Sequence, residues 1–155
     1  AIRSVRAANK AMPSIDISYD PSLPDVQIEA DAMVQVLINL IQNGIDALAQ
    51  AEDPQIGIST RFVMGAALRS EGDKGVRLPV EVAISDNGPG IAQHIENELF
   101  SPFVTTKREG QGLGLAIVRK YLSQMNGRIS VERDPESQRT IFRIFLPVAE
   151  RKTSA

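Results

Sequence analysis

Three clusters of residues in this 155-residue chain could together form a pocket for a nucleotide and its metal ion. Residues 39–47 read NLIQNGIDA, residues 86–91 read DNGPGI, and residues 110–115 read GQGLGL. Amide oxygens suit a hard cation such as Mg²⁺, a carboxylate can accept a hydrogen bond from a base edge, and glycines let phosphate groups approach the backbone. Any one cluster is weak evidence, so the prediction depends on their combination.

The first cluster lies within residues 31–51, whose periodicity predicts an amphipathic helix. Apolar residues recur there at i, i+3 and i+4 spacing, and the polar residues on the opposite face are Asn39, Asn43, Asp46 and Gln50. Most polar helix faces are simply solvated. Two asparagines and Gly44 nevertheless lower the helix propensity, Gly44 by about 1 kcal/mol relative to alanine, which favours a functional role. The Asn43 side chain is the candidate Mg²⁺ ligand.

The second cluster follows a predicted strand of residues 80–84. Asn-Gly and Pro-Gly dipeptides are common in tight turns, so a turn with no function is the alternative interpretation. A carboxylate at a buried strand end could accept a hydrogen bond from the exocyclic amine of adenine, whereas guanine presents a carbonyl there. Asp86 would therefore select ATP over GTP, and Gly88 and Gly90 would let the backbone approach the base.

The third cluster opens a predicted helix of residues 113–125, with a stop at Asn126-Gly127. Glycines before a helix N-terminus are typical of a phosphate site, although a glycine-rich entry into a helix can also be purely structural. The third glycine of a dinucleotide fingerprint would stand at Leu115, and no GxxxxGK[ST] phosphate loop occurs, so neither motif is present.

Residues 100–111 are predicted to form a mobile loop between the second and third clusters. Phe100 and Phe103 are expected to be core residues, and they would anchor the base of this loop if it acts as a lid. Lys107 could contact a phosphate as a point charge. The single histidine of the chain, His94, is predicted to lie on the surface rather than at a catalytic site.

Composition limits the class of protein. The net charge of −2 argues against a dedicated nucleic-acid binder or a domain that contacts anionic membranes. The chain has no cysteine, which excludes disulfides and thiolate metal sites. Its length suits one domain, for which we expect residues 1–11 as a linker or the end of a preceding helix, residues 12–149 as the domain, and residues 150–155 as a tail.

The predicted elements indicate an α/β protein. Strands are expected at residues 15–19, 56–63, 80–84, 128–133 and 140–146, with a short extended piece at 26–28, a surface loop at 64–78 and a possible short helix at 92–99. Few helices connect these strands, so we predict a two-layer sandwich in which a mixed sheet packs against helices on one face.

Taken together, the clusters resemble the catalytic ATP-binding domain of bacterial sensor histidine kinases, in a superfamily with DNA gyrase, Hsp90 and MutL. The matching motifs are an asparagine box (Asn39, Asn43), a first glycine box (Asp86, Gly88, Gly90), a phenylalanine box (Phe100, Phe103), a second glycine box (Gly110, Gly112, Gly114) and a closing strand at 140–147. Residues 20–25 and 35–43 are most similar to nitrogen-regulation kinases of the NtrB type, and residues 102–107 are similar both to that group and to oxygen-sensing FixL kinases.

The resemblance implies the ATP-binding sandwich called the Bergerat fold, with ATP and Mg²⁺ as cofactors. It implies catalytic roles for Asn39 and Lys107 and a contact of Asn43 with the metal. The nucleotide-binding residues it implies are Asn39, Asn43, Asp46, Asp86, Gly88, Gly90, Ile91, Thr105, Thr106, Lys107, Gly110, Gly112, Leu113, Gly114, Leu115 and Thr140.

The resemblance also implies transfer of the γ-phosphoryl group to a histidine on a separate dimerisation domain, and then to a response regulator, NtrC-like if the subfamily holds. The chain has no phosphoacceptor histidine motif, so we expect it to bind ATP without phosphorylating itself. We expect a cytoplasmic location, a monomer as this piece and a dimer at full length. We expect no nucleic-acid partner, and no membrane contact by this piece.

Three alternatives remain at this point: a hydrolysing ATPase of the gyrase, Hsp90 or MutL kind, a protein-serine kinase, and a non-catalytic binding module. The ATPases use a glutamate at the position of Asn39 to activate water, and the serine kinases tend to carry it as well. An amide cannot act as a general base near pH 7, so Asn39 argues against rapid hydrolysis.

Overall fold

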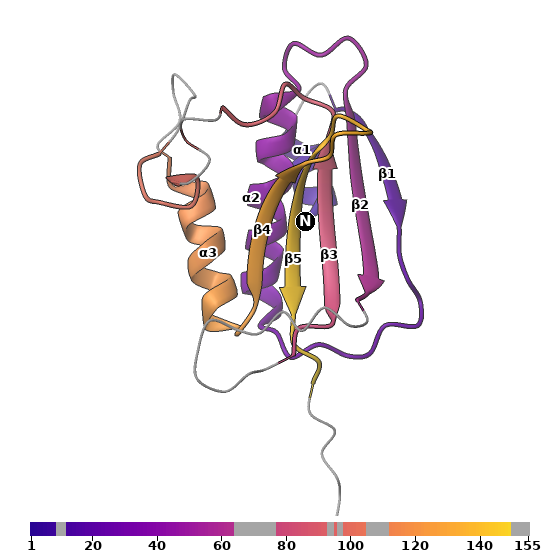
Figure 1. Cartoon of the computed structure of the whole chain (residues 1–155), viewed down its shortest axis with the longest axis vertical. Coiled ribbons are helices and arrows are strands. Elements are labelled where there is room, and N and C mark those ends of the chain that lie inside the picture. Colours follow the sequence, from indigo (N-terminus) through magenta and orange to yellow (C-terminus); the bar gives the residue numbers. More distant parts are fainter. Residues whose placement is uncertain (9–11, 64–76, 93–94, 96–97, 105–111, 150–155) are drawn as a thin grey trace, which may run out of the picture.

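The fold is a five-stranded mixed sheet with helices on one face. The computed structural model describes residues 1–8, 12–63, 77–92, 95, 98–104 and 112–149. The helices are α1 (Ile2–Ala8), α2 (Ala30–Ala47) and α3 (Gly114–Gln124), and the strands are β1 (Ser14–Ser18), β2 (Gln55–Phe62), β3 (Val80–Asp86), β4 (Arg128–Arg133) and β5 (Thr140–Leu146). The strand order is β1-β2-β3-β5-β4, in which β1 and β2 are parallel and the other pairs are antiparallel (Figure 1).

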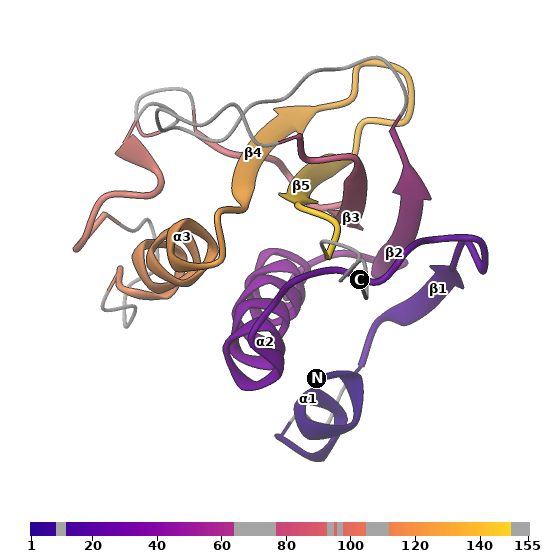
Figure 2. The ribbon, with the colours of Figure 1, turned by 90° about the horizontal axis from the view of Figure 1, so that it is seen from below.

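The two layers enclose one apolar core. Figure 2 shows the three helices on the same side of the sheet. Residues at i, i+4 and i+5 of α2, namely Val36, Leu40 and Ile41, are at most 1% exposed and pack with inward-facing residues of the sheet and of α3. The predicted two-layer α/β sandwich is confirmed.

Alternation along β5 brings a row of side chains under the helices. Thr140, Phe142, Ile144 and Leu146 point inward and are buried, whereas Arg143 between them points to the other face. Because β5 pairs with both β3 and β4, its first residue, Thr140, lies beside the last residue of each neighbour. The same end of the sheet therefore presents the ends of three strands.

Two predicted helices differ from the structure. The α2 helix ends at Ala47 rather than Ala51, because the Leu48 N–H bonds to the carbonyls of both Gly44 and Ile45, at 3.1 Å each, and tightens the last turn. Gln50 is therefore exposed beyond the helix. Of the possible short helix at 92–99, the structure describes residues 92, 95, 98 and 99, and of these Ile95 and Glu98 have 3₁₀ rather than α-helical geometry.

Two further predictions, the end of the helix before Asn126-Gly127 and the extended piece at 26–28, are confirmed by the backbone. Asn126 has a φ of 54°, and the Gly127 N–H donates to the Leu122 carbonyl at 2.8 Å, which is the hydrogen bond of a Schellman stop. The extended piece near 26–28 forms a single bridge from Val26 to Val148. At the N-terminus, residues of the expected linker form α1, whose Val5 is 2% exposed and packs in the core.

No helix among the described residues is long and apolar enough to cross a membrane.

Candidate functional site

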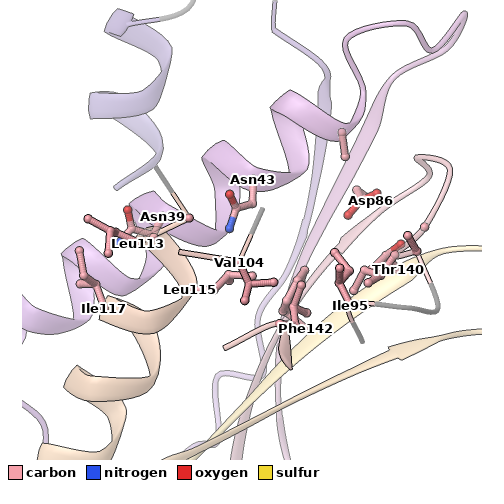
Figure 3. Close-up of a pocket in the computed structure, with 17 residues that line it drawn as sticks. Asn39, Asn43, Asp86, Ile95, Val104, Leu113, Leu115, Ile117, Thr140 and Phe142 are labelled. Atoms are coloured by element: carbon pink, nitrogen blue, oxygen red, sulfur yellow. The ribbon is translucent and has the colours of Figure 1, made fainter. Parts of the chain in front are cut away.

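A cavity of about 400 Å³ lies between α2, the start of α3 and the ends of β3 and β5. All three sequence clusters contribute to its lining. The predicted site residues that line it are Asn39, Asn43, Asp86, Gly90, Ile91, Gly112, Leu113, Gly114, Leu115 and Thr140. Figure 3 shows the asparagines on α2, with Asp86 and Thr140 together on the sheet. One pocket thus has amides along one wall and a carboxylate on another.

The amide wall comes from one row of α2. Asn39 and Asn43 are four residues apart, so their side chains project from the same face of the helix. The Nδ2 atom of Asn39 is buried and has no hydrogen-bond partner among the described residues. Because an unpaired buried donor destabilises a fold by about 1–3 kcal/mol, this donor is expected to find its partner in a bound molecule.

The carboxylate wall is formed by Asp86, the last residue of β3, which is 5% exposed. Its Oδ1 accepts a hydrogen bond from the Gly88 N–H at 2.9 Å. Burial raises the pKa of Asp86, while the Gly88 hydrogen bond and the charges of Arg133 and Arg139 oppose that rise in part. The site therefore holds a desolvated acceptor.

Gly88 does not line the cavity but contacts the Asp86 carboxylate through its N–H group. A Cβ added at Gly88 would lie 2.8 Å from Asp86 Oδ1 and 3.2 Å from the Ala47 carbonyl oxygen. Any larger residue would have to displace the carboxylate or the end of α2. The first glycine box thus lets a turn close tightly over Asp86.

Gly112 and Gly114 of the second glycine box have different roles. The Phe103 N–H donates to the Gly112 carbonyl at 3.0 Å, and Gly112 has a φ of +66°. A Cβ there would lie 2.6 Å from the Phe103 carbonyl carbon, so only glycine fits. By contrast, a Cβ at Gly114 would meet only Asn39 Oδ1, at 4.0 Å, and would project into the cavity.

The remaining predicted site residues lie elsewhere. Asp46 is exposed, accepts a hydrogen bond from Gln42 Nε2 at 2.7 Å and does not line the cavity. Ala47, four residues after Asn43, lies on the face of α2 that lines the cavity, whereas Asp46 lies on another face. Thr105, Thr106, Lys107 and Gly110 fall outside the described residues, as does His94.

The apolar part of the lining was not predicted from the sequence: Ala47, Ala92, Ile95, Leu99, Val104, Ile117 and Phe142. Two of these could have been found from spacing, because Ala47 is four residues after Asn43 on a helix and Phe142 is two residues after Thr140 on a strand. The others come from loops and from the first turn of α3, where no periodicity identifies them.

The chain is similar to known proteins over most of its length. Residues 28–150 match the family described as "Histidine kinase-, DNA gyrase B-, and HSP90-like ATPase". The chain is 40% identical over 134 residues to a sensory histidine kinase/phosphatase NtrB of Rhizobium leguminosarum bv. phaseoli, covering 86% of this chain and 34% of the relative. It is 44% identical over 134 residues to the NtrB of Rhodobacter capsulatus, covering 86% and 37%.

A solved structure confirms the fold. The catalytic domain of the histidine kinase ThkA superposes with a TM-score of 0.69 at 28% identity, over 94% of this chain and 84% of that one. The chain spans about a third of the length of the curated relatives it matches. The expected resemblance to NtrB-type histidine kinases is confirmed, and the chain belongs to the family of histidine kinase-, DNA gyrase B- and HSP90-like ATPases.

Proposed function

We propose that this chain binds Mg²⁺-ATP and presents its γ-phosphoryl group to a histidine on a separate dimerisation domain, as the catalytic domain of a two-component sensor kinase. The observation that carries the proposal is one cavity lined by a buried carboxylate, Asp86, and by Asn39, whose buried Nδ2 donor has no hydrogen-bond partner among the described residues. The first group suits a base with an exocyclic amine, and the second suits a phosphate oxygen.

The adenine would lie at the sheet. Asp86 and Thr140 are the buried polar groups of that wall, and apolar Ile91 and Phe142 line the space around them. Apolar walls with a few placed polar groups are typical of small-molecule sites. The raised pKa of Asp86 follows from its desolvation, and in a desolvated site a hydrogen bond to the ionised carboxylate is stronger than in water.

The phosphates would lie between α2 and the start of α3. Helix α3 begins without a side-chain cap, so the N–H groups of its first turn suit an anion. Gly114 keeps the approach open on the side of Asn39. Asn39 would donate its Nδ2 hydrogen to a phosphate oxygen, which would pair the buried donor. Lys107 stays a predicted phosphate contact.

The residues also fit Mg²⁺. Among the described residues, no group of three or more His, Cys, Asp or Glu side chains could hold a metal ion. Mg²⁺ in nucleotide sites is commonly held by phosphates, waters and one or two protein oxygens, and the Asn43 amide oxygen in the cavity wall can supply such a ligand. The ion would supply neutralisation of phosphate charge during transfer.

Asn39 favours phosphotransfer over hydrolysis. An amide in this position can hold a phosphate but cannot remove a proton from water near pH 7. The acceptor histidine must then come from another domain. Two apolar side chains are exposed for contact with such a domain: Ile117 of the cavity lining (37% exposed) and Phe103, next to the lining residue Val104 (77% exposed). The NtrB relatives make an NtrC-like response regulator the proposed final acceptor. The cytoplasmic location and the oligomeric state stay predictions.

The proposal is tested by phosphotransfer in trans. The chain is mixed with labelled Mg²⁺-ATP and a separately purified dimerisation domain of an NtrB-type kinase, with a histidine-to-glutamine version of that domain as control. We expect acid-labile, base-stable phosphate on the wild-type acceptor alone and none on this chain. Steady release of ADP that does not depend on the acceptor would instead favour the ATPase alternative.

A further inference from the structure

We propose that Arg133 is a specificity-determining positioning residue, which fixes the Thr140 hydroxyl as a hydrogen-bond donor toward the base and so makes the cavity selective for adenine. This role rests on the proposed nucleotide function. Arg133 does not line the cavity, and it belongs to none of the sequence clusters.

Three residues form one row across the end of the sheet. Asp86 of β3 pairs directly with Thr140 of β5, and Thr140 pairs directly with Arg133 of β4. Directly paired residues on neighbouring strands project from the same face of a sheet, so the three side chains lie side by side. Figure 3 shows Asp86 and Thr140 together at the sheet side of the cavity.

A single nitrogen of Arg133 links the hydroxyl to the first glycine box. Nη1 donates to the Gly88 carbonyl oxygen at 2.8 Å and to Thr140 Oγ1 at 3.3 Å, which accounts for both of its hydrogens. The guanidinium also lies under Gly90, where an added Cβ would be 3.1 Å from Nη1. Arg133 thus holds the turn and the hydroxyl in one arrangement.

The hydrogen bond from Arg133 decides what Thr140 offers to a ligand. A hydroxyl has one hydrogen, and its oxygen can also accept. When Oγ1 accepts from Nη1, one of its two acceptor positions is filled, and the hydroxyl hydrogen must point away from the guanidinium, where it can donate to another group. Thr140 is 4% exposed, so bulk water has little access to it. The wall then presents an acceptor at Asp86 and, beside it, a donor at Thr140.

This pair of groups complements adenine and opposes guanine. The Watson–Crick edge of adenine carries an amine donor beside a ring-nitrogen acceptor, whereas guanine carries a carbonyl acceptor beside an N–H donor. Guanine would place acceptor against acceptor and donor against donor. Without Arg133, the Thr140 hydroxyl could rotate and accept from the guanine N–H, so one of the two mismatches would be relieved.

Arg139 provides a matched control. Like Arg133, its positive charge acts on Asp86, but its Nη2 donates to Gln55 Oε1 at 2.6 Å, away from Gly88 and Thr140. The substitution Arg139→Met therefore removes the same charge from the neighbourhood and leaves the hydroxyl in place. A difference between Arg133→Met and Arg139→Met isolates the hydrogen bond from the electrostatic effect.

The test is a calorimetric titration of the purified chain and its variants with Mg²⁺-ATP and Mg²⁺-GTP. Loss of one neutral-acceptor hydrogen bond corresponds to about three- to tenfold in affinity. We expect the ATP-over-GTP preference to fall by that factor in Arg133→Met and in Thr140→Val, with no further fall in the double variant, and to stay unchanged in Arg139→Met. Thermal unfolding of each variant reports folding separately.

Different results of these titrations would contradict different parts of the proposal. An unchanged preference in folded Arg133→Met, or an equal fall in Arg139→Met, would overturn the role of Arg133. Additive falls in the double variant would show that Arg133 does not act through Thr140. If Arg133→Met does not fold, a full preference in Thr140→Val is enough to refute the proposal. Failure of the wild-type chain to bind ATP would instead remove the proposed function itself.

Discussion

Replacing Asp86 with asparagine should move stability and ATP affinity in opposite directions. Asparagine has nearly the same size, and its Oδ1 can still accept the Gly88 N–H that Asp86 accepts at 2.9 Å. The change therefore removes a buried charge and places an NH₂ group where the cavity had an acceptor. General damage to the fold would lower both quantities, so opposite signs identify the mechanism.

The stability effect follows from the raised pKa of Asp86. Because burial raises the folded-state pKa above the ordinary value of 3.8, the contribution of Asp86 to stability is fully present below that value and is lost as pH rises through the folded-state pKa. The gain in stability from Asp86→Asn should therefore be small below pH 3.8, grow as pH rises through the folded-state pKa of Asp86, and level off above it. Because Gly88 and two arginines already offset part of the cost of burying the carboxylate, we expect Asp86→Asn to raise the free energy of unfolding by only about 1 kcal/mol, which is about 3 °C in Tm.

The binding effect is larger. Removing the acceptor of a charge-assisted hydrogen bond is worth about 2 kcal/mol, which is about 30-fold in ATP affinity. GTP should lose much less, because the new NH₂ group can donate to the guanine carbonyl. Calorimetry with both nucleotides and thermal unfolding from pH 4 to pH 8 measure the two effects. Full ATP-over-GTP preference in Asp86→Asn, or a lower Tm at pH 7, would refute this account of Asp86.

Three further predictions concern the other walls of the cavity. Asn43→Ala should fold normally and lose the gain in ATP affinity that Mg²⁺ provides, and an unchanged Mg²⁺ dependence in the titration would remove Asn43 as the ligand. Asn39→Leu should raise the free energy of unfolding, measured by chemical denaturation, by about 1 kcal/mol, because it removes an Nδ2 donor that has no partner among the described residues. Its ATP affinity should fall about tenfold. A lower free energy of unfolding would contradict this prediction. Gly112→Ala should lower the free energy of unfolding by about 1–3 kcal/mol, because its Cβ would clash with the Phe103 backbone. Gly114→Ala should keep its Tm and bind ATP several-fold more weakly. Equal losses of Tm in the two variants would contradict these separate roles.

Local patterns in the sequence were sufficient to predict the groups that face the cavity. The i, i+4 spacing of Asn39 and Asn43 places both on one wall, and the apolar run before Asp86 predicts a carboxylate at a buried strand end. The stop at Asn126-Gly127 depends on a backbone conformation that these residues favour, and it was found where expected. Each of these features is decided within a few neighbouring residues.

Contacts between distant segments could not be predicted in this way. The position of Arg133 beside Thr140 depends on the register of β4 on β5, and its contact with Gly88 joins residues 45 positions apart. The role of Gly88 depends on where α2 ends, because Ala47 lies against it. The apolar lining from Ile95, Leu99 and Val104 depends on loop packing. Tertiary structure decides all three, and no periodicity in the sequence reports it.

The central claim is that the cavity binds ATP selectively with help from Mg²⁺. The most direct measurement is a calorimetric titration of the purified chain with ATP and with GTP, each with and without Mg²⁺, followed by an assay for ADP. We expect ATP binding that Mg²⁺ strengthens, much weaker GTP binding, and no steady release of ADP. Equal binding of the two nucleotides, or no binding of either, would contradict it.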